Sequence, residues 1–572
     1  MGGWGSSVDV LVVGSGGAGH CAALRARDLD LDVLLVEKLP RWGGNTAMSA
    51  GAIWIPAHPW APQPDSEDEG VRYLRAALRD GGSEAQLRAF VREGGRMLAY
   101  LVERSRLRLR CMETYPDYHD ELPGGRAGGR GLETEPIDGE LLADDFATLE
   151  AAYPGELMMG KFMMAMPEAR RLLEPGLSPY LAMSKGMLGY ALRARRRARL
   201  GGRDPYLTMG QALMARMRLS LRDRKVPMWL EAPLTDLVVE GGRVVGAVVR
   251  RGAREVRVEA RRGVVIAAGG FERNDALRER YHRAPSSASW SAGSAGNTGD
   301  GILIGERIGA RLDTAQMHEA WWTPATRPPG DDYNAVMVIE KSLPHGIFVN
   351  RRGERFTNEA ASYTAVVQAM YADHAATGAN VPCWWVIDAT YRKRYPMGPV
   401  EPASITSDAQ LAKKRPRWAP GAGWLHRAAT LDELATQIAV PAAALRATVE
   451  RFNAHARAGE DRDFGRGASA NDRYYSDARV RPNPSLGSIE TAPFYAVQVF
   501  PSDLGTKGGL ATDPGGRVLD TSDRPIPGLY AAGNSKTSAM GDAYPGPGVT
   551  IAEALTSGFL AAESIAADVA RR

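Results

Sequence analysis

The sequence predicts an α/β fold in which a domain built on a parallel sheet is split in sequence around an inserted α+β domain. Three apolar strands indicate this arrangement. The first, Val10–Val13, is a continuous apolar run, as expected for a strand buried on both faces of a parallel sheet. The second and third, 262–270 and 526–534, each run into glycine near their ends and lie far along the chain. We therefore expect the chain to leave the first domain and to return to it near the C-terminus.

A glycine fingerprint follows the first strand. Residues 14–19 form a complete G-x-G-x-x-G, and a helical pattern begins at His20. The first glycine of such a motif permits a tight turn, the second lets the backbone approach a pyrophosphate, and the third allows close helix–strand contact. Another apolar strand, 31–36, follows in the sequence and ends at Glu37. The distance from Gly14 to Glu37 is the spacing of an acid that binds ribose hydroxyls. This order of elements indicates a Rossmann-type dinucleotide-binding domain rather than a glycine-rich turn.

The segment after Glu37 has the composition of a cofactor-binding loop. It contains Gly43-Gly44 and several hydroxyl side chains, and it ends at Gly51. A loop of this kind, placed directly after the ribose-binding acid, can wrap the phosphates and the ring of a cofactor. An ordinary surface loop is the alternative, but residues 48–55 are too apolar for a free loop.

Composition limits the class of protein. The 572 residues suffice for about four domain-sized units, and the nearly balanced net charge of +4 does not suggest a nucleic-acid binder. We expect no membrane-spanning segment and no signal peptide, because no apolar run has the necessary length and the N-terminus lacks a basic and apolar leader. Three scattered cysteines, Cys21, Cys111 and Cys383, indicate neither a disulfide framework nor a metal site, and they fit a reducing cytoplasmic setting.

Two stretches in the first 130 residues are less specific. Residues 70–107 have a helical pattern, and residues 112–129 break into turns. Tyr118 lies in these turns. Composition alone gives it no special role, because most loop tyrosines are half-buried packing residues.

Residues 157–203 form an unusual insertion. Five methionines precede an apolar helical stretch, 177–192, which runs into five arginines. An apolar helix that ends in an arginine cluster is typical of a segment lying on a membrane surface. A core helix with a solvated basic end is the alternative. One stripe of the helix consists of Leu177, Leu181, Leu188 and Leu192.

The remaining patterns divide the rest of the chain. Residues 232–250 are predicted to form a β-meander, and the polar stretch 461–484 is predicted to be a surface loop. A helix over 549–567 would aim free backbone N–H groups at whatever lies before it. The predicted domains are 1–290 and 494–572 for the split cofactor domain and 291–493 for the inserted substrate domain.

Several motifs make the chain recognisable. The glycine fingerprint, GGNTAMSAG (43–51), AAGGF (267–271), GTKGGL (505–510) and GLYAAGN (528–534) resemble the fumarate-reductase-like FAD flavoprotein superfamily, over nearly the whole chain. Three further stretches are similar to the 3-ketosteroid Δ1-dehydrogenases: 116–125, 342–371 and 540–550. The chain departs from that family at Pro547, where alanine is more usual, and in the longer, more basic insertion 157–203.

The resemblance implies a cofactor and a set of site residues. The cofactor is FAD, which we expect to be bound non-covalently, because loop 43–51 contains no histidine at the place where a superfamily relative attaches its flavin. The implied catalytic residues are Tyr363 as general base, Tyr118 as its hydrogen-bond donor, and Tyr544 with the Gly548 N–H as donors to a steroid 3-oxo group. The cofactor-binding residues are Gly14, Gly16, Gly17, Ala18, Gly19, Glu37, Lys38, Gly43, Gly44, Asn45, Thr46, Ser49, Ala50, Gly51, Ala268, Gly269, Gly533, Asn534, Gly548 and Val549.

The implied reaction is the FAD-dependent 1,2-desaturation of a 3-ketosteroid. It needs a base for the C2 proton, donors for the enolate oxygen and a flavin N5 that accepts hydride from C1. A free tyrosine has a pKa of about 10, and a hydrogen bond from Tyr118 to the Tyr363 phenolate would favour the charged form. The implied partners are the steroid, an external quinone- or dye-like electron acceptor and a membrane surface. The expected location is cytoplasmic, on the inner face of the cell membrane.

Three other functions remain open. A fumarate-type dicarboxylate reductase would need arginines and histidines to clamp two carboxylates, for which Arg351, Arg352 and Arg355 are the candidates. A 3-keto-5α-steroid Δ4-dehydrogenase would use the same flavin and a related tyrosine set. A flavin-containing binding or membrane-scaffold protein without turnover is supported only by residues 157–203.

Overall fold

The structure is a computed structural model that describes residues 3–79, 84–174, 176–330 and 333–570. Residues 80–83, in the middle of the predicted helical stretch 70–107, lie outside the described residues, and so does residue 175 in the insertion. The rest of that stretch forms α3 (Glu67–Ala77) and α4 (Glu84–Arg104), as its periodicity predicts.

A sheet of order β20-β21-β11-β1-β2-β8 organises the first domain. β1 (Ser6–Val13) lies between β11 (Arg254–Ile266) and β2 (Val33–Val36) and pairs with both in parallel. β21 (Pro525–Ala531) pairs in parallel with β11, so a strand from near the C-terminus belongs to the same sheet as β1. The chain therefore leaves this sheet and returns to it, and the predicted α/β fold is confirmed.

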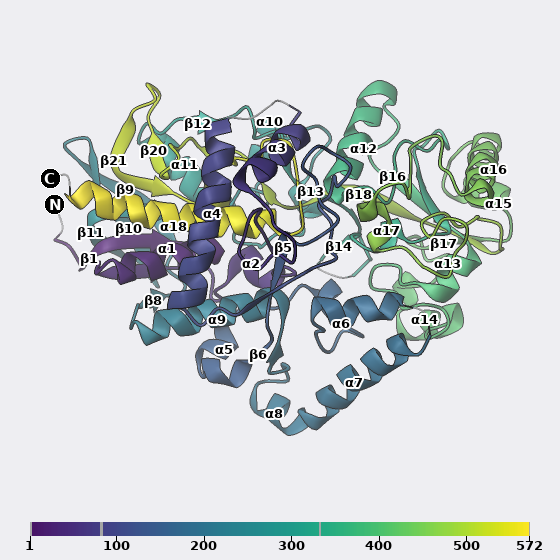
Figure 1. The fold of residues 1–572 in the computed structure, drawn as a ribbon, viewed down its shortest axis with the longest axis horizontal. Helices are drawn as coiled ribbons and strands as arrows, with labels where there is room; N and C mark the ends of the chain where they lie inside the picture. Colours follow the sequence, from purple (N-terminus) through teal and green to yellow (C-terminus); the bar gives the residue numbers. More distant parts are fainter. Residues whose placement is uncertain (1–2, 80–83, 175, 331–332, 571–572) are drawn as a thin grey trace.

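Long helices cover this sheet. α1 (Gly17–Asp28) follows the glycine fingerprint, α18 (Val549–Ala570) packs along α1, and α4 crosses α18 (Figure 1). Among the described residues, α18 is the one helix long and apolar enough to cross a membrane, contrary to our expectation that no segment reaches that length. Because 67% of its apolar window is buried inside the protein, α18 is a core helix by its packing.

The predicted meander is present at the edge of this sheet. β9 (Leu234–Glu240) and β10 (Arg243–Arg251) are antiparallel, and β10 pairs with β11. The other elements of the domain are α2 (Gly44–Met48), β3 (Ile53–Trp54), β4 (Leu109–Cys111), β5 (Gly131–Thr134), β6 (Ile137–Asp138), α5 (Asp145–Thr148), β7 (Tyr206–Leu207), α9 (Met209–Asp223), β8 (Met228–Trp229), α10 (Asp275–Tyr281), α11 (Asp300–Arg307), β12 (Leu312–Asp313), β19 (Gly509–Leu510) and β20 (Arg517–Leu519).

The inserted domain is built on a second, antiparallel sheet. Its order is β14-β13-β18-β16-β15, and β17 also pairs with β18. Apolar clusters pack on both of its faces. Its strands are β13 (Ala320–Thr326), β14 (Ala335–Val336), β15 (Gly346–Val349), β16 (Cys383–Ile387), β17 (His426–Ala428) and β18 (Phe494–Thr506). Its helices are α12 (Tyr363–Thr377), α13 (Ala389–Arg394), α14 (Asp408–Lys414), α15 (Leu431–Gln437), α16 (Ala442–Ala458) and α17 (Ala470–Tyr474).

The predicted domain boundaries, 290/291 and 493/494, stay a prediction, and strand pairing shows which sheet each nearby element joins. β18 was placed in the returning segment that starts at residue 494, but it pairs with β13, β16 and β17 of the second sheet. α11, placed in the inserted domain, contacts β9 and β19 of the first domain. The chain crosses between the domains near residues 313–320 and 506–509, because strand pairing rather than composition decides where each sheet ends.

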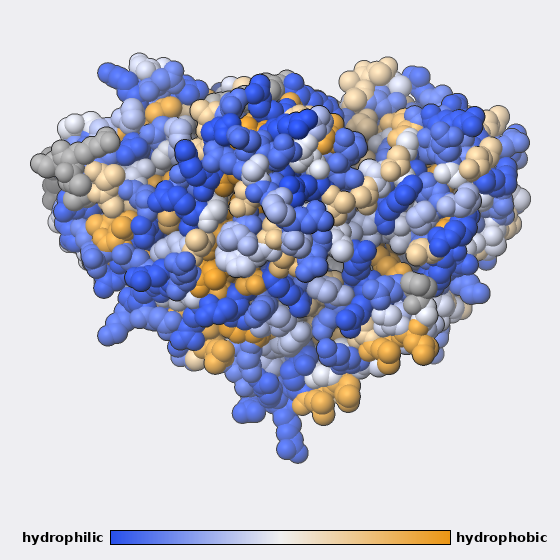
Figure 2. Space-filling model, in the orientation of Figure 1, coloured by the Kyte–Doolittle hydropathy of each residue, from blue (hydrophilic) through white to orange (hydrophobic). Residues whose placement is uncertain are grey.

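Residues 157–203 form a lobe at the edge of the molecule. It contains α6 (Met166–Arg170), α7 (Ser178–Leu192) and α8 (Ala194–Arg199). The predicted leucine stripe is exposed rather than buried: Leu177, Leu181, Leu188 and Leu192 are 74%, 67%, 62% and 77% exposed. Figure 2 shows apolar side chains gathered along the lower edge of the molecule, where Figure 1 places α7. The alternative of a core helix is therefore wrong for this chain.

Candidate active site

A large cavity lies against the first sheet and encloses about 1960 Å³ of empty space, its open mouth included. Its lining contains the turn after β1, the start of α1, the loop after β2 and the start of α18. The predicted cofactor-binding residues in its lining are Gly14, Gly16, Gly17, Ala18, Glu37, Lys38, Gly44, Asn45, Thr46, Ser49, Ala50, Gly51, Ala268, Gly269, Gly533, Asn534 and Gly548. Their roles in binding stay predictions, but the fold brings all of them to one cavity.

Three predicted cofactor-binding residues do not line the cavity. A Cβ at Gly19 would lie 1.9 Å from the Gly14 carbonyl oxygen, so this glycine permits close packing of α1 on the β1 turn. Gly43, at φ 116°, precedes α2, where a Cβ would collide with Ala47. Val549 is fully buried in the apolar core. These residues support the cavity wall without facing the cavity.

The glycine fingerprint forms an open cradle. A Cβ at Gly14 would lie 2.2 Å from the Ala267 carbonyl oxygen, whereas a Cβ at Gly16 would have no protein atom closer than 3.9 Å. The space in front of Gly16 is therefore left for a ligand, and the N-terminus of α1 presents free backbone N–H groups and positive dipole there. The residues present fit the pyrophosphate of a dinucleotide.

Glu37, the acid after β2, already accepts hydrogen bonds from other groups of the protein. One Glu37 carboxylate oxygen, Oε2, accepts from the Ser15 N–H and Oγ at 3.0 and 2.6 Å, and Oε1 accepts from the Leu39 N–H at 2.9 Å. A carboxylate has about four lone-pair sites, so Glu37 can still accept from a ribose. Thr46 Oγ1 accepts from the Gly17 N–H at 3.0 Å and fixes α2 against the start of α1.

Three tyrosines from distant parts of the chain meet in the same cavity. Tyr118 donates a 3.0 Å hydrogen bond to the Tyr363 hydroxyl. The ring centroid of Tyr544 lies 5.4 Å from that of Tyr118 and 5.0 Å from that of Tyr363. All three line the cavity and all three are buried. Tyr118 and Tyr544 belong to the first domain and Tyr363 to the second, so the cluster spans both.

The loop that carries Tyr544 is held from several sides. The Pro545 carbonyl accepts from the Tyr118 N–H at 2.9 Å and from the Tyr73 hydroxyl. Lys507, which is fully buried, donates to the carbonyls of Gly541 and Ala543 at 2.8 and 2.6 Å. These contacts fix the backbone on both sides of Tyr544.

Gly548 lies at a position that excludes any side chain. Its φ is 101°, and a Cβ there would lie 2.2 Å from the Ala52 carbonyl oxygen. Glycine is required at this position because both the backbone conformation and the close approach exclude a side chain. α18 begins at the next residue, so the positive end of this helix faces the cavity near Tyr544.

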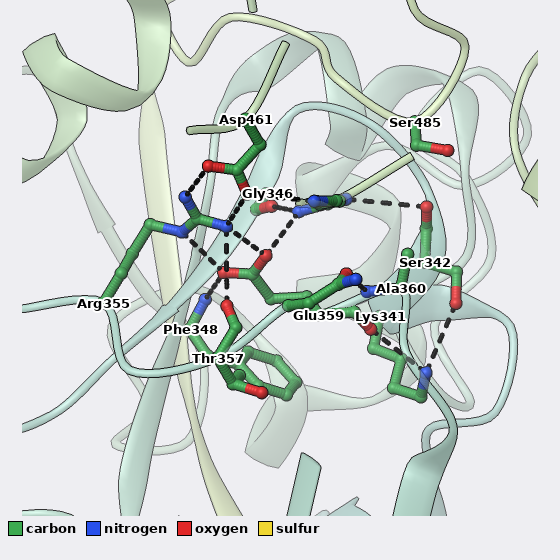
Figure 3. A network of polar contacts seen from close by, with 12 residues as sticks. Lys341, Ser342, Gly346, Phe348, Arg355, Thr357, Glu359, Ala360, Asp461 and Ser485 are labelled. Carbon is green, nitrogen blue, oxygen red and sulfur yellow. Dashed lines mark hydrogen bonds and ion pairs between the residues drawn. The ribbon is translucent and has the colours of Figure 1, made fainter. Parts of the chain in front are cut away.

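A buried ionic network supports the loop before Tyr363 (Figure 3). The Glu359 carboxylate accepts from Arg355 at 2.8 Å and from Arg466 at 2.9 Å, and Arg355 also pairs with Asp461 at 3.0 Å. Lys341 Nζ donates to the Glu359 carbonyl at 3.0 Å and to the Ala361 carbonyl. The chain is thus fixed at 359–361, just before the first turn of α12.

The environment of Tyr363 acts on its pKa in two directions. Burial raises the pKa of Tyr363 well above the ordinary value of a tyrosine, and the neighbouring Tyr544 and Tyr115 add to this rise. The hydrogen bond donated by Tyr118 lowers the pKa, because it stabilises the phenolate. The hydrogen bond from Tyr118 therefore acts against the effect of burial on Tyr363.

Sequence reasoning missed part of the lining. The segment 292–297 and residues Tyr115, Tyr153, Glu156, Tyr475 and Val336 also face the cavity. The glycine- and serine-rich run SAGSAGNTG (291–299) was a usable signal for the first of these. Tyr475 lies in the stretch 461–484, which was wrongly predicted as surface loop. Asp461 and Arg466 of this stretch are buried and pair with Arg355 and Glu359. Its other arginines, Arg462, Arg473, Arg479 and Arg481, are exposed.

Comparison with known proteins identifies the class of protein to which this cavity belongs. The family model described as "FAD binding domain" matches residues 9–551, so the chain belongs to that family and is an FAD-dependent oxidoreductase. Within it, the chain belongs to the 3-oxosteroid 1-dehydrogenases, also called 3-ketosteroid Δ1-dehydrogenases.

Two relatives carry this assignment, and a third similar protein has a different named activity. The 3-oxosteroid 1-dehydrogenase of Mycolicibacterium smegmatis is 40% identical, over 99% of this chain and 98% of its own. The crystal structure of 3-ketosteroid Δ1-dehydrogenase from Sterolibacterium denitrificans in complex with 1,4-androstadiene-3,17-dione is 44% identical, with a TM-score of 0.93 over 98% of this chain and all of that one. A 4-oxocyclohexanecarboxylate 2-dehydrogenase of Sinomonas cyclohexanicum is 34% identical, over 99% of this chain and 94% of its own.

We expect the FAD to be released by acid. The described residues that line the cavity include no histidine and no cysteine, so the side chains that most often attach a flavin covalently are not at hand. Acid precipitation of the purified yellow protein should leave free FAD in the supernatant, measured by its absorbance and fluorescence. A pellet that keeps its flavin after washing would contradict non-covalent binding.

Proposed function

We propose that this protein catalyses the 1,2-desaturation of 3-ketosteroids. The observation that carries the proposal is the meeting of Tyr118, Tyr363 and Tyr544 in the cavity that also contains the dinucleotide cradle. The Tyr363 oxygen takes the proton from C2, and Tyr118 stabilises the resulting phenolate. The Tyr544 hydroxyl and the Gly548 N–H hold the 3-oxo group and stabilise its developing negative charge. FAD, when bound, supplies the acceptor for hydride from C1.

The charge distribution of the cavity favours a ketone over a dicarboxylate. Among the described residues in its lining, the arginine and lysine cations are Arg41 and Lys38, and Lys38 is already paired with Asp300 at 2.6 Å. Of the three arginines considered for a carboxylate clamp, Arg351 and Arg352 are exposed, and Arg355 is paired with Glu359 and Asp461. A fumarate-type substrate would therefore lack the paired cations that its two carboxylates require.

Anaerobic bleaching of the bound flavin tests the proposal. The enzyme is mixed without oxygen with 4-androstene-3,17-dione, a 5α-reduced 3-ketosteroid, 4-oxocyclohexanecarboxylate and succinate. We expect bleaching by 4-androstene-3,17-dione, and a 1,4-dien-3-one product by NMR. A double bond at C4–C5 from the 5α-steroid alone would support the Δ4 alternative. Bleaching by succinate alone would support the dicarboxylate enzyme, and no bleaching by any compound would support a binding protein.

The electrons must then leave the enzyme. We propose an external quinone- or dye-like acceptor as the partner that reoxidises the flavin, since the reaction takes two electrons from each substrate molecule.

We also propose that the protein lies on the inner face of the cell membrane, attached through α7. The support is a row of exposed leucines on a helix that also exposes Tyr180 and Met187. Only part of the adjoining arginine cluster is available for lipid headgroups, because Arg193 is paired with Asp204, and Arg196 with Asp138 and Glu140. Arg195 and Arg199 are exposed. Apolar burial is therefore the main source of the proposed attachment.

Flotation with anionic liposomes measures this attachment. We expect the protein to float, to detach in detergent and to remain largely bound in high salt, because screening acts on few charges and leaves apolar burial intact. Replacing Leu181, Leu188 and Leu192 by serine should release it while leaving turnover of detergent-dissolved steroid unchanged. Ile405→Ser is the matched control, since Ile405 is 59% exposed in the other domain. Unmodified protein that stays in the soluble fraction would contradict the proposal.

A further inference from the structure

Glu156 is a half-buried residue with one carboxyl oxygen that is shielded from solvent. It ends the short 3₁₀ turn η2 (Pro154–Glu156) and lines the cavity. Its Oε2 atom is shielded from solvent and has no hydrogen-bond partner among the residues that the structure describes. Burial raises the pKa of Glu156 well above its ordinary range, and no neighbouring cation or donor counteracts this. The raised pKa favours the protonated form, which can both donate and accept.

The turn that carries Glu156 is fixed against the inserted domain. The Tyr153 hydroxyl accepts from the Val336 N–H at 2.9 Å and donates to the Asn334 carbonyl. Tyr153, Glu156, Val336 and Val338 all line the cavity, and we call them the η2 wall. A wall anchored in this way presents the carboxyl at a defined place.

The η2 wall and the group that would hold the 3-oxo atom come from different elements. Tyr153 and Glu156 lie at the two ends of η2, whereas Tyr544 lies in the loop before α18. With the 3-oxo group held by Tyr544 and Gly548, Glu156 is left for another part of the ligand.

Polar groups in an otherwise apolar pocket fix the orientation of the ligand and set its specificity, and a buried polar group without a partner is costly to keep. Apart from Glu156, the side chains of the η2 wall are valines and a tyrosine whose hydroxyl is already bonded. We propose that Glu156 is a specificity-determining residue that hydrogen-bonds an uncharged oxygen of the substrate, a ketone or a hydroxyl, other than the reacting ketone. This inference rests on the proposed function and names the substrate class of the same site.

Two substrates that differ by one oxygen test the inference. The FAD-loaded enzyme is assayed with 4-androstene-3,17-dione and with androst-4-en-3-one, which lacks the oxygen at C17. We expect wild-type kcat/KM to favour the dione by roughly tenfold or more, because an unmet buried hydrogen bond penalises the analogue. Glu156→Leu should bring the ratio close to one, mainly by losing the dione. Glu156→Gln is the matched control and should keep most of the preference, because its amide still donates.

The outcomes separate this inference from the proposed function. A ratio that stays within about twofold of wild type in Glu156→Leu overturns the inference, while turnover of both steroids leaves the proposed function standing. Equal losses of kcat/KM for both substrates in the Leu and Gln variants would show that Glu156 has a structural role, and they would also overturn the inference. If Glu156→Leu does not fold, the decision rests on wild type and Glu156→Gln. Both must then prefer the dione over the analogue in kcat/KM, and a missing preference in wild type overturns the inference. If no steroid is turned over, equilibrium binding of the same pair, followed by the flavin spectrum, decides on Glu156 alone.

Discussion

Tyr363→Phe is expected to lower kcat by about a hundredfold or more. The substitution removes the hydroxyl that accepts the 3.0 Å hydrogen bond from Tyr118 and leaves the ring that packs 5.0 Å from Tyr544. The protein should fold, bind FAD and bind product-like steroids with little change, because only one atom is lost. The measurement is single-turnover flavin reduction, which isolates the chemical step from product release.

Tyr371→Phe is the control for this variant. Tyr371 lies on the same helix, is buried, and donates to the Pro285 carbonyl at 3.1 Å outside the cavity lining. It should lose some stability and little activity. Near-normal flavin reduction in Tyr363→Phe would mean that Tyr363 only packs and that another group removes the proton.

Gly16→Val is expected to abolish FAD binding and with it all turnover. A Cβ at this position has no protein atom within 3.9 Å, so the valine enters the open space in front of α1 without a clash inside the protein. The protein should therefore remain folded and purify colourless. The measurements are the flavin content per chain and the far-UV circular dichroism spectrum.

Gly95→Val serves as its control. Gly95 lies on α4, and a Cβ there has no atom within 4 Å, so the same substitution is made in open space away from the cavity. That variant should keep a full complement of flavin. Near-stoichiometric FAD in Gly16→Val would show that the pyrophosphate does not pass close to the fingerprint.

The parts of the fold that the sequence predicts well are those with local signals. β1, the glycine turn, α1, β2 and Glu37 lie within about thirty residues, and each has a distinct residue pattern. The end of the inserted domain has no local signal, because β18 is defined by pairing with β13 and β16, far away in the sequence. The polar stretch 461–484 was mispredicted for a similar reason: its charges find their partners near residue 359.

The candidate site shows the same division. Tyr118, Tyr363 and Tyr544 were placed through the family resemblance, and the structure brings them together. Glu156 was not found, since a single glutamate next to a proline and a glycine has no pattern that distinguishes it from a solvated residue. The helical period of 177–192 predicted that the leucines share one face of a helix. The period does not tell whether protein or solvent lies against that face.

The division of the reacting groups between two domains has an evolutionary consequence. The cradle, Tyr544 and Gly548 belong to the split domain, whereas Tyr363 arrives on the inserted one. Drift in the inserted domain can therefore move or replace Tyr363, the proposed proton acceptor, while the cofactor cradle and the proposed carbonyl-binding donors are inherited unchanged. A descendant that altered only α12 and the loop before it would keep its cofactor and acquire a different regiochemistry, so new desaturases on this scaffold can arise without passing through a form that has lost its flavin.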